Sequence, residues 1–480
     1  MLKNLGKESA VYGIGQVINS AIAVLILPIL TRSFSTAEIG LIDLLTVVET
    51  FGIIFSTLGV DTALTFYFWD NKHDVNKQKK YISTAFISLL LFSTLSFFLL
   101  LSLRQPIERF YLKGEVGQVY FYALLIIPFM CMYSLFAKLC RIFRKPILFN
   151  IITVTYVLIY ILFVLLFIYK VNLGIEAVFI GKGVGYSIII VISIIYFRKS
   201  LFHGIDFKYL KEMLAYGLPL TPLLLIDWIM KFSDRFFINQ FLTTTELGYF
   251  AVYVKIAMGI TIIVGAFNKA WGPFAMSIKD QAGVQNVYAK AMNVYIFLTF
   301  IAALCIQMVS PVLVRIFATQ EYLARGYLIG FLSVPIIFHG MYGIVSVGLN
   351  ITKKNIFITF GVLIASLINI ALDYFLIPKY GLTGATIATS TGYFSAILII
   401  YLLSKKIYPI PFTFNKIIIV TGILICLMYL ITFIYNADLG LIINILIDLG
   451  LLVLFFGAFV YLKIIQMKDV KKIFLKLKFR

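Results

Sequence analysis

The seven residues FSTAEIG at 34–40 return 208 positions later as LTTTELG at 242–248. A longer match keeps almost the same offset, because GIEAVFIGKGVGY at 174–186 corresponds to GLTGATIATSTGY at 381–393. A proline in an apolar segment of the first half also has a counterpart at this spacing. Motifs that recur at a fixed offset indicate an internal duplication. The chain is therefore expected to contain two homologous halves.

The composition of the 480-residue chain is that of a membrane protein. Hydrophobic residues make up 61% of it, charged residues only 13%, and the mean hydropathy is +1.01. Soluble domains average about 25% charged residues, and an apolar run of about 18 residues or more is long enough to cross a bilayer. An all-α integral membrane protein with fourteen transmembrane helices is predicted. The predicted spans are 11–31, 39–61, 81–103, 119–137, 147–169, 174–197, 213–241, 246–268, 287–309, 326–350, 355–377, 381–403, 417–435 and 440–462.

The duplication divides these spans into three parts. Residues 1–206 and 207–410 are expected to form six-helix lobes, and residues 411–480 to add two helices and a basic tail. Because six is even, both lobes enter the membrane from the same side, as parallel repeats do in transporters. The connection at 198–213 has the mixed composition of an amphipathic interfacial helix.

Positive charge is unevenly distributed between the two sides of the membrane. Alternating connections carry 27 Lys and Arg residues on one side and 8 on the other. The excess marks the cytoplasmic side, so both termini are predicted to be cytoplasmic. The net charge of +20 is then explained by topology and contact with the lipid bilayer, and nucleic-acid binding is not expected. The four cysteines and three histidines show no ligand spacing, so neither a metal site nor a disulfide is predicted.

Four charged residues lie in the predicted span 213–241. Asp227, Lys231, Asp234 and Arg235 are three or four positions apart, which places most of them on one stripe of a helix. Charges inside a membrane normally face a partner or a cavity. One interpretation is that they neutralise each other structurally. The other is that Lys231 and Arg235 line a substrate cavity, while the nearby Pro219 and Pro222 bend a gating helix.

Lys182 and Lys255 are the cations that local pairing explains least, since no carboxylate lies within four residues of either. They are predicted at similar depth in different lobes, as expected of two lysines that converge on one diphosphate. Pairing with acids on neighbouring helices is the alternative. Lys269 is a further candidate for headgroup entry.

Several acids in the spans lack a basic residue within four positions, namely Asp43, Glu49, Asp61 and Asp373. A buried acid needs a partner or a raised pKa. They are predicted either to pair with the lysines above or to bind the proton or sodium ion that drives transport. The candidates for cation coupling are Asp43, Asp61, Asp227 and Asp373, with Asp43 first.

Two stretches resemble polysaccharide flippases of the multidrug/oligosaccharidyl-lipid/polysaccharide exporter superfamily. They are YGIGQVINSAIAVLILPILTRSFSTAEIGLIDLL at 12–45 and YGLPLTPLLLIDWIMKFSDRFFINQFLTTTELGYFAVYVKI at 216–256. KYGLTGATIAT at 379–389 fits the start of the family's twelfth helix. Phe66 stands where these proteins often carry an arginine, so no substrate contact of that arginine is expected here.

The resemblance implies alternating access between two lobes, with undecaprenyl-diphosphate-linked oligosaccharide carried from the cytoplasmic to the periplasmic leaflet of a bacterial inner membrane. The headgroup would be bound by Lys182, Lys255, Lys231, Arg235 and Lys269, and the lipid tail by a groove at the last two helices. The prolines assigned to gating are Pro28, Pro128, Pro219, Pro222 and Pro335. No cofactor beyond the coupling ion is expected. The protein is expected to act as a monomer and to contact the polysaccharide polymerase machinery.

Two other functions remain open at the level of sequence. A cation-coupled multidrug exporter of the same superfamily would use an acidic cavity, and the spans carry eight acids against six bases. A membrane polymerase or acyltransferase would need a large loop or a histidine with catalytic neighbours, which His339 lacks. The flippase is therefore the leading prediction, and the chain is not expected to be an enzyme.

Overall fold

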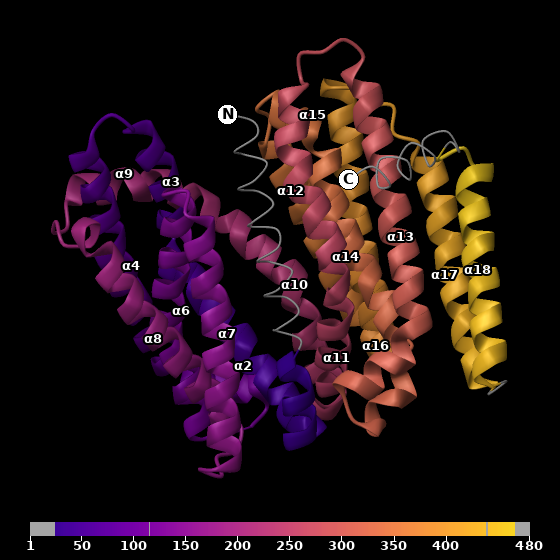
Figure 1. Cartoon of the computed structure of the whole chain (residues 1–480), viewed down its shortest axis with the longest axis horizontal. Coiled ribbons are helices and arrows are strands. Elements are labelled where there is room, and N and C mark those ends of the chain that lie inside the picture. Colours follow the sequence, from indigo (N-terminus) through magenta and orange to yellow (C-terminus); the bar gives the residue numbers. More distant parts are fainter. Residues whose placement is uncertain (1–24, 115, 438–439, 466–480) are drawn as a thin grey trace. The chain divides into compact units, whose positions relative to one another are not determined.

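The computed structural model describes residues 25–114, 116–437 and 440–465. Helices and the turns between them account for these residues, with no strand in the described ranges. The chain divides into two compact units, residues 1–251 (the N-terminal unit) and residues 252–480 (the C-terminal unit). The predicted all-helical fold is confirmed (Figure 1).

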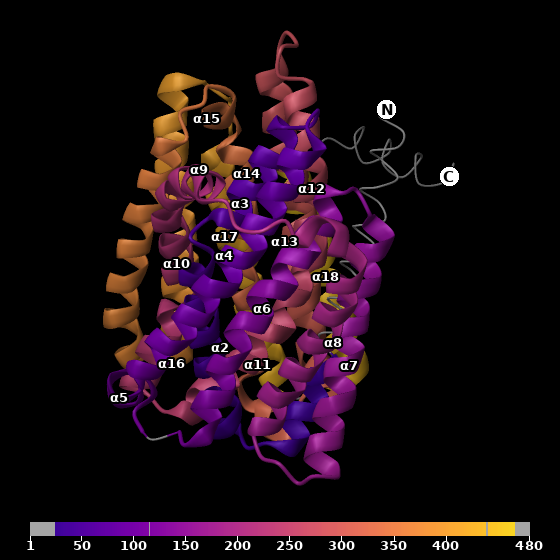
Figure 2. The same ribbon diagram turned by 90° about the vertical axis from the view of Figure 1, so that its left-hand side faces the viewer.

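The N-terminal unit begins, within the described residues, with a helical segment over 25–33. Helices α7 and α8 run side by side in Figures 1 and 2, and α9 packs across α3 and α4. The elements of the N-terminal unit are α2 (Thr36–Thr57), α3 (Val60–Asp70), α4 (Val75–Ser102), α5 (Arg104–Ile107), the π-helical turn η1 (Glu108–Leu112), α6 (Gln118–Ile142), α7 (Pro146–Tyr169), α8 (Glu176–Leu201), α9 (Phe207–Gly217), the 3-10 turn η2 (Leu218–Leu220), α10 (Thr221–Phe241) and the first part of α11 (Thr244–Ala257).

The C-terminal unit pairs α14 with α16 and α17 with α18 (Figure 1). Its elements after α11 are η3 (Met258–Ile260), α12 (Thr261–Ser277), α13 (Val284–Phe317), η4 (Gln320–Arg325), α14 (Leu328–Val345), α15 (Val347–Ile351), α16 (Ile356–Ile407), α17 (Phe414–Asn436) and α18 (Leu441–Tyr461).

Twelve helical stretches of the described residues are long and apolar enough to cross a membrane. Helix α16 contains two predicted spans, 355–377 and 381–403, which meet at a kink where Gly381 has φ 58° and ψ −136°. The first predicted span, 11–31, lies mostly outside the described residues. Fourteen transmembrane helices therefore remain a prediction, whereas a multi-pass helical membrane protein is confirmed.

The predicted helix over 39–61 is wrong at its C-terminal end. Leu58 has φ 44° and ends α2, Gly59 has φ 73°, and α3 begins immediately afterwards. A Cβ atom on Gly59 would lie 2.4 Å from the carbonyl oxygen of Gly217, so two backbones touch at this break. Only a glycine combines this positive φ with such a close approach at little steric cost. The break thereby separates α2 from a distinct helix α3.

The matching segments of the duplication pack in matching helix pairs. In the N-terminal unit, Tyr186 of α8 packs on Tyr133 of α6, with ring centroids 5.1 Å apart. In the C-terminal unit, Tyr393 of α16 packs on His339 of α14 at 5.4 Å. Both α6 and α14 carry an internal proline at corresponding positions. The local packing follows the repeat, while the lobe boundaries at 206 and 410 remain predictions.

The two copies of the repeated turn touch each other inside the N-terminal unit. A Cβ atom on Gly40 would lie 2.1 Å from the carbonyl oxygen of Thr244, and one on Gly248 would lie 1.8 Å from the carbonyl oxygen of Thr36. Real Cβ atoms do not approach backbone this closely, so both positions require glycine. The contact fixes the start of α2 against the start of α11.

Candidate functional site

Helix α2 carries two of the predicted intramembrane acids, Asp43 and Glu49, and its start is well defined. The Ser35 hydroxyl caps the helix by accepting from the Glu38 backbone N–H at 3.3 Å. The Glu38 carboxylate in return accepts from the Ser35 N–H at 2.8 Å, which completes a capping box. Together with the contact at Gly40, this cap sets the depth of Asp43 and Glu49 along the helix.

Arg235 on α10 joins two carboxylates. Its Nη1 donates to Asp234 Oδ1 at 2.7 Å, and its Nε donates to Asp43 Oδ2 of α2 at 3.4 Å. A third bond runs from Nη1 to the carbonyl oxygen of Lys231 at 3.0 Å. The guanidinium also lies 5.2 Å from the ring centroid of Phe250. The predicted coupling acid Asp43 and the predicted headgroup cation Arg235 are thus partners of each other in a buried cluster.

The C-terminal end of α10 is tied to η1, which supplies an aromatic hydroxyl to this cluster. Asn239 Nδ2 donates to the carbonyl oxygen of Tyr111 at 2.8 Å, and Gln240 Nε2 donates to that of Phe110 at 2.5 Å. The Tyr111 ring stacks on Phe236 with centroids 6.2 Å apart. Its hydroxyl oxygen is buried and has no hydrogen-bond partner within the described ranges. Burial and the negative charges of Asp43 and Asp234 raise the pKa of this phenol, so it stays neutral.

Lys182 on α8 is paired with Glu49 on α2. The Nζ atom lies 3.0 Å from Oε2 and 3.3 Å from Oε1. The Glu49 side chain is only 2% exposed and that of Lys182 is 15% exposed. The pairing alternative considered for Lys182 is therefore the one that the structure displays.

Two further pairs differ in their exposure to solvent or lipid. Lys138 of α6 donates to the carboxylate of Asp61 on α3, and both side chains are mostly buried. Lys231 donates to Asp227 at 2.6 Å along α10, and both side chains are about 40% exposed. Of the predicted headgroup cations in the N-terminal unit, Lys231 is the most accessible.

The remaining predicted site residues lie in the C-terminal unit. Lys255 of α11 is half-buried, Lys269 of α12 is exposed, and Asp373 of α16 is fully buried. Since Lys182 and Lys255 belong to different units, their convergence on one diphosphate remains a prediction. Among the described residues, no group of three or more His, Cys, Asp or Glu side chains is placed to hold a metal ion.

The prolines assigned to gating occupy different structural positions. Pro28 lies in the helical segment 25–33, Pro128 inside α6 and Pro335 inside α14. Pro219 lies within η2, and Pro222 is in the first turn of α10. The predicted single helix over 213–241 is thus interrupted by a 3-10 turn, as expected of prolines that remove backbone donors.

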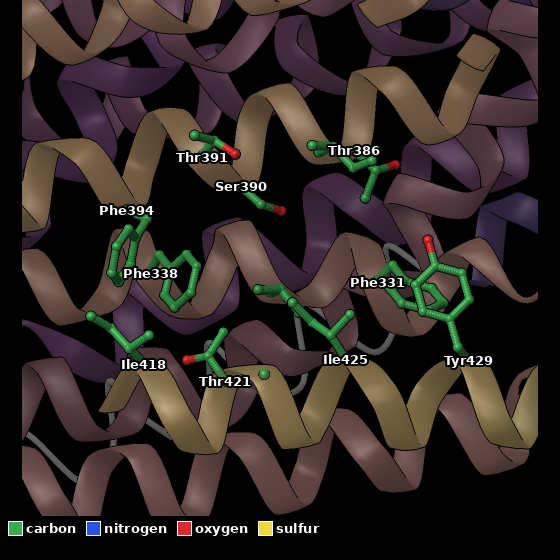
Figure 3. Close-up of a pocket in the computed structure, with 13 residues that line it drawn as sticks. Phe331, Phe338, Thr386, Ser390, Thr391, Phe394, Ile418, Thr421, Ile425 and Tyr429 are labelled. Carbon is green, nitrogen blue, oxygen red and sulfur yellow. The ribbon is translucent and has the colours of Figure 1, made fainter. Parts of the chain in front are cut away.

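An apolar groove of about 350 Å³ opens between α14, α16 and α17 (Figure 3). Side chains from the three helices point toward one another across it, including Phe338, Ile425 and Tyr429. The hydroxyls of Thr386 and Thr421 donate to their own helix backbones at 2.9 and 2.8 Å, so these two polar groups are satisfied within their helices. The lipid-tail groove was expected at the last two helices; this groove shares α17, but α14 and α16 form its other walls.

Two residues of these clusters were missed by the sequence analysis. Lys138 was assigned to a cytoplasmic connection, but α6 extends to Ile142 and carries it to Asp61. Tyr111 was treated as part of a loop, because the single π-helical turn that positions it has no recognisable sequence signal. The pairs between helices were considered only as an alternative, since linear spacing cannot identify them.

Residues 29–326 match the family described as polysaccharide biosynthesis protein, which is more than half of the chain. The chain belongs to this family. A Shigella flexneri protein named "Putative O-antigen transporter" is 24% identical over 210 residues, which cover 42% of this chain and 49% of that protein. The chain thus spans about half the length of this curated relative.

Solved structures of other transporters share the fold. The lipid II flippase MurJ, in an inward closed conformation, has a TM-score of 0.71 at 16% identity, over 95% of this chain and 98% of that one. An inward-facing multidrug resistance MATE family transporter of the MOP superfamily has a TM-score of 0.64 at 15% identity, over 82% and 94%. At these identities the similarity shows the fold alone. The family membership predicted from the sequence is confirmed.

Proposed function

We propose that this protein is a flippase that moves undecaprenyl-diphosphate-linked oligosaccharide from the cytoplasmic to the periplasmic leaflet by alternating access. The match of residues 29–326 to a polysaccharide biosynthesis family supports a saccharide substrate. The observation that carries the lipid part is the groove between α14, α16 and α17, which lies within membrane-spanning helices and is almost wholly apolar. A substrate with a sugar headgroup and a long hydrocarbon tail accounts for both the family match and the apolar groove.

The headgroup carries a diphosphate, and the accessible cations are the groups that would bind it. Lys231 is 42% exposed even though it donates to Asp227, and Lys269 is exposed, whereas Lys182 and Arg235 are mostly buried against carboxylates. In this proposal Lys231, Lys255 and Lys269 meet the diphosphate first. Lys182 and Arg235 would join only after leaving Glu49 and Asp43.

The remaining parts of the proposal follow from the same function. The protein would reside in a bacterial inner membrane with both termini cytoplasmic, act as a monomer and deliver its substrate to the polymerase machinery. It would perform transport and make or break no covalent bond. Transport would be driven by a coupled cation.

The test uses full-length protein in proteoliposomes that contain a fluorescent undecaprenyl-diphosphate oligosaccharide. Chemical quenching from outside measures how much headgroup has crossed the bilayer. Thr421→Trp should fill the groove and slow crossing several-fold, because a tryptophan side chain occupies the space that a tail needs. Ile419→Trp is the matched control, since this exposed residue on the same helix does not line the groove.

Each outcome has a definite meaning. Crossing that is slowed by Thr421→Trp and unchanged by Ile419→Trp supports the flippase. If wild-type protein moves no lipid-linked oligosaccharide but extrudes a cationic dye such as ethidium, the proposal is overturned in favour of a multidrug exporter.

A further inference from the structure

The turn between α6 and α7 ends its helix with an unusual set of residues. Arg144 has φ 51°, and its backbone N–H donates to the carbonyl oxygen of Arg141 at 3.1 Å. The next backbone N–H, of Lys145, donates to the carbonyl oxygen of Cys140 at 2.8 Å. These two bonds around a left-handed residue form a Schellman motif, which satisfies carbonyl groups at the end of a helix.

The turn between α15 and α16 repeats this arrangement in the C-terminal unit. Lys353 has φ 58°, and its N–H donates to the carbonyl oxygen of Asn350 at 3.2 Å. The N–H of Lys354 donates to the carbonyl oxygen of Leu349 at 2.9 Å. Each residue lies 209 positions after its counterpart in the α6–α7 turn, close to the offset of the internal repeat. The motif therefore belongs to the repeat.

Both turns carry cations where a Schellman motif normally has uncharged residues. Its left-handed position is usually glycine, because a Cβ atom strains this backbone, and the next position frequently makes an apolar contact. Arg144 and Lys353 occupy the first position, and Lys145 and Lys354 the second. We call these two pairs the dibasic turns. The helix dipole favours a cation here, but Arg141 already supplies one in the last turn of α6.

The side chains of the dibasic turns are exposed, and their charge is not compensated by the protein. None of the four lies within 4 Å of a carboxylate oxygen in the part of the chain that the structure describes. The Arg144 guanidinium lies 5.1 Å from the ring centroid of Trp69, and the Lys145 ammonium lies 4.7 Å from that of Tyr196. Tryptophan and tyrosine are typical of the level of lipid headgroups.

An exposed apolar stripe follows each dibasic turn along the next helix. Its members are each more than 50% exposed and occupy corresponding positions of the repeat, namely Ile147, Ile151 and Leu158 of α7, and Ile356, Phe360 and Leu367 of α16. Their spacing places each set of three on one face of a helix. Both helices are long and apolar enough to cross a membrane, so these faces meet acyl chains. Each unit thus has two cations at the head of a lipid-facing stripe.

We propose that each dibasic turn and the apolar stripe beside it bind one anionic phospholipid, so that the chain carries two equivalent lipid sites. The phosphate accepts hydrogen bonds from the two cationic side chains, and such charge-assisted bonds are strong. The acyl chains lie along the stripe. Anionic phospholipids give the cytoplasmic leaflet its negative surface potential, and both turns are predicted on that side.

This inference is independent of the transported substrate and goes beyond the charge bias that sets topology. The positive-inside rule needs only that Lys and Arg residues lie on one side of the membrane. It does not need them at the same two strained positions of both repeats. A backbone that is locked before the lipid arrives lowers the entropy lost on binding, which gives the motif a use.

Native mass spectrometry of the full-length protein counts the phospholipids that remain bound. The protein is taken from vesicles that contain phosphatidylglycerol and phosphatidylethanolamine in equal amounts. Wild type should retain two phosphatidylglycerol molecules per chain. Arg144→Asn/Lys145→Gln and Lys353→Asn/Lys354→Gln should each retain one, and the combined variant none. Asparagine is chosen for the left-handed position because it is enriched in this backbone conformation.

The matched control is Lys208→Gln/Lys279→Gln. It removes two positive charges from exposed residues of the same predicted side, outside both dibasic turns, and should retain two phosphatidylglycerol molecules. Arg144→Gly is a second measurement that does not depend on the asparagine variants. Because glycine relieves the strain, this variant should melt no lower than wild type, yet it should lower phosphatidylglycerol retention at the α6–α7 turn several-fold.

Four results would overturn the proposal. They are unchanged retention in both dibasic variants, an equal loss in the control, retention of phosphatidylethanolamine as readily as phosphatidylglycerol, and unchanged retention in Arg144→Gly where only that variant can be measured. A fifth would reassign the turns: if undecaprenyl phosphate displaces phosphatidylglycerol at equal concentration, they serve substrate entry and the phospholipid proposal falls.

Discussion

The pair Glu49–Lys182 predicts an unequal response to removal of its two partners. Lys182→Met leaves the Glu49 carboxylate, which is 2% exposed, without its cation. Loss of one partner of a buried pair costs about 3–5 kcal/mol. Glu49→Gln leaves an ammonium that is 15% exposed on a flexible stem, which reaches water more easily, so we expect a loss of about 1–3 kcal/mol. The double variant Glu49→Gln/Lys182→Met should recover most of the stability, because no charge remains buried.

These energies are measurable as melting temperatures. At roughly 2–4 °C per kcal/mol for a unit of this size, Lys182→Met should melt about 6–20 °C below wild type. The assay is intrinsic-fluorescence melting of purified protein in detergent at one fixed scan rate, because membrane proteins often unfold irreversibly. Headgroup crossing is measured in parallel for each variant.

Two results would refute the reasoning in different ways. A double variant that melts as low as Lys182→Met would show that the two side chains do not stabilise each other. A double variant that is stable but no longer moves substrate would show that Lys182 contacts the substrate, and the structural interpretation of the pair would fall.

Three further predictions concern single positions. Gly40→Ala should lower stability by about 1–3 kcal/mol, because the added Cβ overpacks against a backbone. Gly183→Ala is the control and should be neutral or stabilising, because a Cβ at Gly183 meets nothing within 4 Å. Equal melting temperatures of the two variants would contradict this prediction. Gly381→Ala should cost about 1–3 kcal/mol, because its φ of 58° with ψ −136° is essentially restricted to glycine; an unchanged melting curve would mean that the kink relaxes. Lys231→Ala should change stability by no more than about 1 kcal/mol, because exposed pairs contribute little, yet reduce headgroup crossing; a large loss of stability would mark its pair with Asp227 as structural.

Much of the helical framework could be predicted because membrane helices leave a strong linear signal. The apolar runs placed α4, α6, α7 and α8 within a few residues of their observed positions. The repeat predicted two homologous halves, and the packing of α6 with α8 and of α14 with α16 agrees with it. The break at Leu58 and Gly59 was not predicted, because it depends on contact with Gly217, more than 150 residues away.

The candidate site was predicted as a set of residue types but not as a set of partners. Charges inside apolar spans singled out Asp43, Lys182 and Arg235. Their partners follow from which helix faces align in three dimensions, and hydrophobic spacing does not encode that. Tyr111 could not be found by charge at all, since a tyrosine near a membrane surface is ordinary.

The contact between the repeated turns is reciprocal. Gly40 lies against Thr244, and the corresponding Gly248 lies against Thr36, so each copy supplies one glycine and one receiving carbonyl. An interface in which each side presents the same patch to the other is isologous, the arrangement of two identical subunits about a two-fold axis. Two separate copies of a single half-length chain could therefore form this contact with one sequence. In such a dimer a substitution of the glycine would be present twice and its cost doubled, whereas in the present chain either side can be altered alone.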